Sequence, residues 1–151
     1  MSATHQLCTF SIGETLFGID VQKIQEVIFY QEMTPVPTAP PAVRGLINLR
    51  GQIVTAIDLR TRLGLPSRAS DLLPTNVIVR TSDGAVSLLV DEIGDVVEVE
   101  PLLFERPPET LTGVAHELVT GIYKLEGRLL LLLDVAGAVT VFPESAESKV
   151  A

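Results

Sequence analysis

The chain has 151 residues, of which 46% are hydrophobic and 20% are charged, and its formal net charge of −8 gives a pI of about 4.7. This balance is typical of a globular protein and excludes a disordered chain. Binding to nucleic acid or to an anionic membrane surface needs a basic face, so the acidic charge argues against both. The lone cysteine, Cys8, has no partner for an intramolecular disulfide, and the apolar run 129–133 is too short to span a membrane. We expect a cytoplasmic protein with no signal peptide and no direct membrane insertion.

Short β-like runs open the chain, and similar runs follow its midpoint. Phe10 and Ile12, then Phe17 and Ile19, alternate with the two-residue period of a β-strand. Turns rich in glycine and acidic residues join the runs in pairs, which predicts two hairpins. The predicted strands cover residues 7–12, 16–21, 76–81 and 85–90.

Helical signals are sparse. Asp20 is placed to cap a short helical turn over residues 21–27, which include Ile24 and Val27. Asp58 is placed to cap a helix over residues 59–63, with a glycine after it as the stop signal. We therefore predict an all-β protein with one to three short helices.

The most informative feature is an internal repeat. Residues 43–59 match residues 119–135 without a gap, and nearly every apolar position coincides. The matched pairs include both glycines and the aspartate of each copy: Gly45 with Gly121, Gly51 with Gly127, and Asp58 with Asp134. A weaker match aligns residues 17–27 with residues 86–96.

The repeat divides the chain into two halves, residues 8–65 and 76–142, joined by a polar linker and followed by a tail at 143–151. Each half has the same order of a hairpin, a proline-rich loop and a glycine-punctuated hairpin. Many short strands in two similar halves predict two small β-barrels that arose by duplication. Because a half of this size would bury little apolar surface alone, we expect the barrels to share an apolar core, and the same argument allows for strands exchanged between the halves.

The residues that an enzyme would need are scarce. His5 and His116 have no metal-ligand spacing with Cys8, and the sequence contains neither a glycine-rich phosphate loop nor a nucleophile elbow. Carboxylates are plentiful, but capping explains three of the best placed: Asp20, Asp58 and Asp134. We expect no catalytic site, no metal and no cofactor.

Three stretches resemble the CheW-like domain: residues 18–27, the proline-rich loop 35–41, and residues 43–60. The resemblance spans roughly residues 6–142. It implies two similar five-stranded barrels of the SH3 or OB type around a common apolar core. It also implies a non-catalytic adaptor that couples methyl-accepting chemoreceptors to the regulatory domain of the histidine kinase CheA, at membrane-associated receptor arrays.

The resemblance further implies two interaction surfaces. One is a receptor-facing groove lined by the segment with Ile24, Glu26 and Val27, and the other is the turn 48–51. A core role is the alternative for Ile24 and Val27, because the second half has apolar residues at the matching positions.

The repeat bears on three further residues, because the second half has Thr120 for Arg44, Lys124 for Asn48 and Glu126 for Arg50. The fold therefore does not dictate these side chains, and we favour an interface role for them. The predicted receptor or kinase interface consists of Ile24, Glu26, Val27, Arg44, Asn48 and Arg50.

Other functions stay open from the sequence. A groove between two barrels is also a plausible small-molecule site, so a ligand-binding double-barrel module is the alternative function. An enzyme that uses paired carboxylates is a third reading. The linker 66–75 and the tail 144–151 carry no pattern that points to a role, and the chemosensory pathway, whether swimming, twitching or another, is not encoded.

Overall fold

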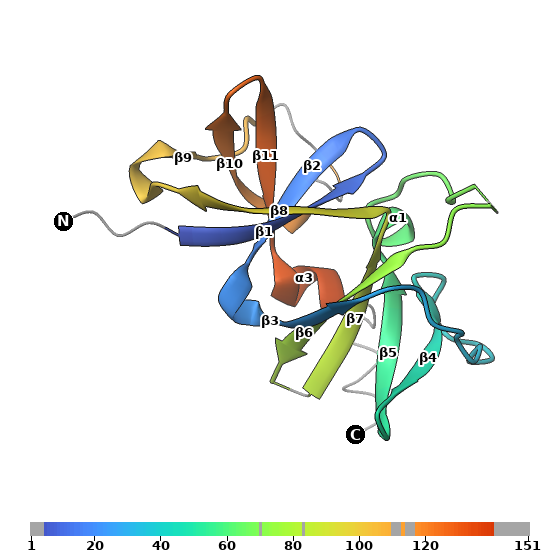
Figure 1. Ribbon diagram of the computed structural model, residues 1–151. Coiled ribbons are helices and arrows are strands. Elements are labelled where there is room, and N and C mark those ends of the chain that lie inside the picture. The colour runs from blue at the N-terminus through green and yellow to red at the C-terminus, as the bar shows by residue number, and fades with distance from the viewer. Residues whose placement is uncertain (1–4, 70, 83, 110–112, 114–116, 141–151) are drawn as a thin grey trace.

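The computed structural model describes residues 5–69, 71–82, 84–109, 113 and 117–140. The predicted tail and His116 lie outside these residues. The described chain is mostly β-structure with two short α-helices, which confirms the predicted fold class (Figure 1). No helix in this part is long and apolar enough to cross a membrane. The strands are β1 (His5–Ile12), β2 (Thr15–Asp20), β3 (Ile24–Ile28), β4 (Val43–Leu49), β5 (Gln52–Asp58), β6 (Thr75–Thr81), β7 (Gly84–Val90), β8 (Glu92–Val99), β9 (Phe104–Glu105), β10 (Val119–Leu125) and β11 (Arg128–Leu133).

The predicted helical signals are partly confirmed. Helix α1 (Leu59–Arg62) begins at Asp58, whose carboxylate accepts a hydrogen bond of 3.0 Å from the Arg60 N–H. Asp20 caps only a single 3₁₀ turn, η1 (Val21–Lys23). The predicted helical turn over 21–27 is therefore wrong beyond η1, because the β-branched residues after it pair with β6 as strand β3.

The second copy contains a helix that we did not predict, α3 (Val135–Val139), and a further 3₁₀ turn, η2 (Pro101–Leu103), follows β8. Asp134 precedes α3 at the position that matches Asp58, but its side chain makes no capping hydrogen bond. The capping role predicted for Asp134 is therefore wrong.

The strands form a six-stranded sheet in the order β8-β1-β2-β11-β10-β9 and a five-stranded sheet in the order β3-β6-β7-β5-β4. Each sheet takes strands from both halves of the sequence. The six-stranded sheet joins the first hairpin, β1–β2, to the late strands, whereas the five-stranded sheet joins the second hairpin, β6–β7, to β3, β4 and β5. The two repeats have therefore exchanged their hairpins.

The strand registers reproduce the internal repeat. Where β5 and β7 run parallel, Ala56 lies opposite Ser87, and where β11 and β2 run parallel, Leu132 lies opposite Gly18. The repeat alignment matches Ala56 with Leu132 and Ser87 with Gly18, so the two junctions are equivalent. The sequence duplication is thus also a duplication of strand pairing.

Two matching glycines allow each sheet to close on itself. A Cβ atom on Gly45 would lie 2.6 Å from the Thr34 carbonyl oxygen, and one on Gly121 would lie 1.9 Å from the Phe104 ring. Thr34 follows β3 and exchanges two backbone hydrogen bonds with Leu46 of β4, at 2.8 and 2.9 Å. In the other sheet, β9 follows β8 and pairs with β10. The chain therefore links the two edges of each sheet, as a small barrel requires.

The core is shared between the two sheets. One apolar cluster contains residues from strands of both sheets and from both helices, and α3 lies between the sheets in Figure 1. A smaller cluster fills each barrel, one around Leu130 and Tyr123, the other around Val54 and Ile47. The shared cluster comprises Phe10, Ile12, Phe17, Ile19, Ala42, Ile57, Leu59, Val77, Val79, Leu88, Val90, Leu118, Val119, Leu133, Val135 and Ala138.

Candidate functional site

Five of the six predicted interface residues lie on strands of the five-stranded sheet and Arg50 lies in one of its turns, but the structure separates the six into two places. The first three lie on β3, and the turn between β4 and β5 brings Arg50 to them. Arg44 lies at the opposite end of β4, six residues from Arg50, which is about 20 Å along a strand. The residues that were predicted to form one interface therefore lie on two separate surfaces.

The tip of the β4–β5 hairpin is a two-residue turn formed by Arg50 and Gly51. Both residues have positive φ values, +52° and +88°, so the turn has the left-handed backbone that suits the twist of a tight hairpin. The Asn48 side-chain oxygen accepts a hydrogen bond of 2.8 Å from the Gly51 N–H. Asn48 therefore has a structural role in holding this turn.

The side chain of Arg50 is 69% exposed and forms an ion pair with Glu26 on β3. Two exposed aliphatic residues stand close to this pair in the sequence: Val27, next to Glu26 on β3, and Ile53, three residues after Arg50, with 38% and 62% exposure. Ile24 differs, because it packs partly against the shared core. We call the group of Glu26, Val27, Arg50 and Ile53 the Arg50 surface.

Ile53 is a member of the Arg50 surface that was not predicted from the sequence. Near the start of strand β5, Ile53 is exposed, Val54 is buried and Thr55 is half-buried. The hairpin predicted at Gly51 puts Ile53 and Val54 on opposite faces of the following strand. The sequence could therefore have predicted that one of these two aliphatic side chains is exposed.

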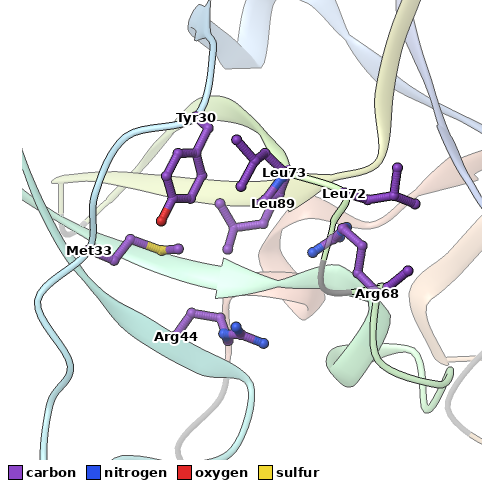
Figure 2. A pocket seen from close by; sticks show the side chains of 9 residues that line it. Tyr30, Met33, Arg44, Arg68, Leu72, Leu73 and Leu89 are labelled. Carbon is purple, nitrogen blue, oxygen red and sulfur yellow. The ribbon is translucent and has the colours of Figure 1, made fainter.

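Around the other end of β4, a cavity of about 300 Å³ opens beside Arg44 (Figure 2). Most of the lining residues are apolar or aromatic and come from three segments, and the linker between the halves contributes five of the lining residues. We call this cavity the Arg44 pocket. It is lined by Tyr30, Met33, Arg44, Arg68, Ala69, Leu72, Leu73, Pro74 and Leu89.

Beneath the pocket lies a cluster of three arginines and two aspartates. Asp58, which is 1% exposed, accepts hydrogen bonds from Arg68 at 3.3 Å and from Arg44 at 3.4 Å. Asp91 accepts hydrogen bonds from Arg60 at 2.6 Å and from Arg68 at 2.8 Å. These five residues form the arginine–aspartate cluster.

Asp91 is ionised across the physiological range. Burial alone would raise the pKa of its carboxyl, but hydrogen bonds from Arg60, the Gly13 N–H and Arg68 bring that pKa well below its usual value. Because Gly13 belongs to the β1–β2 turn and Asp91 lies between β7 and β8, this carboxylate connects the two sheets.

The described residues give little support to catalysis or metal binding. No group of three or more histidine, cysteine, aspartate and glutamate side chains among them could hold a metal ion. Burial raises the pKa of the Cys8 thiol, which disfavours the thiolate that a nucleophile needs. The exposed aliphatic and arginine side chains of the two surfaces are instead typical of protein interfaces.

Known proteins match this chain over most of its length. Residues 6–141 match the model of a family described as the CheW-like domain. The chain is 32% identical to the chemotaxis protein CheW of Treponema pallidum over 134 residues, which are 86% of this chain and 79% of that protein. It is 33% identical to CheW of Bacillus subtilis over 145 residues, 96% of this chain and 92% of that one. Among solved structures, the scaffolding protein TtCheW from Thermoanaerobacter tengcongensis matches with a TM-score of 0.84 and 28% identity, over 92% of this chain and 94% of that one.

Proposed function

Because this chain belongs to the CheW-like family, we propose that it is a non-catalytic scaffold that couples methyl-accepting chemoreceptors to the histidine kinase CheA. The proposal places it in the cytoplasm at receptor arrays. The Arg50 surface is the observation that carries it. An exposed arginine that is held in place by an ion pair, together with exposed aliphatic residues on the same two strands, suits an α-helical partner with a mixed polar and apolar face.

The backbone of Arg50 supports an interface role. A left-handed conformation costs a non-glycine residue about 1 kcal/mol, and only Thr38 and Arg50 adopt it among the described non-glycine residues. The matching turn of the second half uses Glu126 without that conformation. Arginine at this position is therefore required neither by the repeat nor by the turn, and its side chain is the remaining reason for its presence.

The test compares two charge reversals at matching hairpin tips, Arg50→Glu and Glu126→Arg. Both residues are exposed, so each variant should lose less than about 1 kcal/mol of stability in a thermal melt. Binding is measured by co-sedimentation with CheA and receptor-bearing membranes. We expect Arg50→Glu to weaken binding at least about tenfold and Glu126→Arg to leave it unchanged. Wild-type co-sedimentation of Arg50→Glu, or an equal loss in both variants, would overturn the proposal.

A further inference from the structure

The arginine–aspartate cluster has more positive than negative charge. It contains the guanidinium groups of Arg44, Arg60 and Arg68 but only the carboxylates of Asp58 and Asp91. Arg68 is 6% exposed and bonds to both carboxylates, and Arg60 chelates Asp91 through two nitrogens. The surplus charge therefore belongs to Arg44.

Arg44 is also the arginine that is free to bind something else. Its side chain is 49% exposed, and the one hydrogen bond that it makes within the described part of the chain, to Asp58, is long at 3.4 Å. Asp58 does not depend on it, because Arg68 and the Arg60 N–H already bond to its carboxylate. A guanidinium has five N–H donors, so most of those on Arg44 remain available at the pocket.

The fold does not explain why arginine stands here. Thr120 holds the matching position on β10, and Asp134 matches Asp58 there without an arginine partner among the described residues. The second half therefore builds the same strand pair without this positive charge. In a chain with a net charge of −8, a locally cationic pocket is a specific feature of one half.

Beside the two arginines, the residues that line the pocket are apolar or aromatic, and some of them are partly uncovered. Leu72 and Leu73 on the linker are 55% and 64% exposed. Figure 2 shows the Tyr30 ring above the hollow with its hydroxyl directed toward Met33, and Leu73 and Leu89 beside it. Large apolar side chains that remain exposed around an arginine are the composition of a protein docking surface.

From these observations we propose that the Arg44 pocket binds an acidic side chain carried next to an apolar residue on a partner polypeptide. The carboxylate meets Arg44, and the apolar residue packs against Leu72, Leu73 and Tyr30. A carboxylate bound bidentately to a guanidinium is both strong and directional. The proposal deepens the scaffold function and rests on it in one respect, that the occupant is a protein. It also assigns a role to the linker between the halves.

The test uses a short peptide as the probe, N-acetyl-Ala-Leu-Asp-Ala-amide, and its isostere with Asn in place of Asp. Both are titrated into the full chain and followed by amide chemical shifts in NMR. We expect the Asp peptide to bind about tenfold more tightly than the Asn peptide, with shifts centred on residues 30, 44, 72 and 73. Arg44→Thr introduces the residue of the second half, and it should lower the affinity for the Asp peptide to that for the Asn peptide.

Three controls keep the outcome decisive. Arg44→Lys should retain the preference for Asp, while Arg128→Thr, at an exposed arginine on the other sheet, should change nothing. Leu73→Ser should weaken the binding of both peptides equally, because it removes only an apolar contact. A thermal melt of each variant shows whether it is folded.

Several results would overturn the proposal. One is the absence of any preference for Asp over Asn, and another is wild-type affinity in Arg44→Thr. A third is 4-methylpentanoate binding as tightly as the peptide, because the pocket would then take free small acids. Failure of the scaffold function would appear separately, as Arg50→Glu co-sedimenting like the wild type, and it would not alter the peptide titration.

Discussion

Arg50 combines an unfavourable backbone conformation with a favourable side-chain contact. Its positive φ costs about 1 kcal/mol, whereas its exposed ion pair with Glu26 returns no more than about that amount. Stability alone would therefore favour glycine at this position, as it does at Gly51 next to it. The stability of the turn should therefore depend on whether a substitution removes only the ion pair or also relieves the backbone strain.

We expect Arg50→Gly to be within about 0.5 kcal/mol of the wild type, because the relief of backbone strain offsets the lost ion pair. Arg50→Ala keeps the strain and loses the pair, so it should be about 1 kcal/mol less stable than Arg50→Gly. Urea unfolding of both variants measures this difference. Glu126→Gly is the control, because a glycine there gains nothing from strain relief. If alanine proves as stable as glycine at residue 50, the strain assigned to this turn is wrong.

Among the secondary-structure elements, the hairpins and the repeat were predictable because their signals are local. Alternating apolar residues and glycine-rich turns defined β2, β6 and β7 to within one residue at each end, and β1 to within two. Strand β3 was not predictable in this way. An aspartate followed by Ile24 and Val27, three residues apart, fits a helical turn as well as a strand, and only pairing with β6 decides between them.

The segments that close the two sheets, Thr34 against β4 and β9 against β10, depend on glycine at the matched positions 45 and 121. Gly121→Ala would push against the Phe104 ring, and overpacking of this kind costs about 1–3 kcal/mol. We expect Phe104→Ala to relieve the clash, so that the double variant loses at least about 1 kcal/mol less than the sum of the single ones. Denaturant melts of the four proteins give this coupling energy.

Gly45→Ala is the contrasting case, because the nearest atom is the Thr34 backbone carbonyl oxygen. Truncation of a side chain cannot move that atom, so Met33→Ala should not rescue it. Additive losses in the Gly121 and Phe104 pair would show that the ring does not limit the approach of β9 to β10.

For the whole molecule, the sequence predicted two similar units and a shared core and allowed for strands exchanged between the halves, but it did not identify the hairpins as the exchanged strands. Periodicity shows which face of a strand is buried and says nothing about which half supplies its neighbour. The separation of Arg44 from Arg50 was, in contrast, within reach of the sequence, because they stand at opposite ends of one predicted strand. The predicted receptor or kinase interface included both residues, and the length of β4 separates them.

The arginine–aspartate cluster connects the two sheets, so its ionisation should contribute to global stability. Since the folded pKa of Asp91 is lowered, its contribution is full above the unfolded value of about 3.9 and is lost as pH falls through the folded pKa. We expect the melting temperature to fall as pH drops below about 4. Asp91→Asn should be less stable by about 3 kcal/mol at pH 7 and should show a shallower fall in acid.

Calorimetry between pH 7 and pH 2 measures both effects. Asp71→Asn removes an exposed carboxylate outside the cluster and should keep the wild-type profile. Parallel profiles for the wild type and Asp91→Asn would show that Asp91 does not couple protonation to folding.

The exchanged hairpins also bear on how such a protein can originate. Two copies of a half-length chain, each lending its first hairpin to the other, would assemble the same pair of closed sheets as a swapped dimer. In that ancestor both copies would carry the same residue at the positions now held by Arg44 and Thr120. Fusion into one gene removed that constraint, so each half could acquire its own charges while the strand registers stayed matched. The asymmetry on which a coupling protein depends is thus a product of duplication.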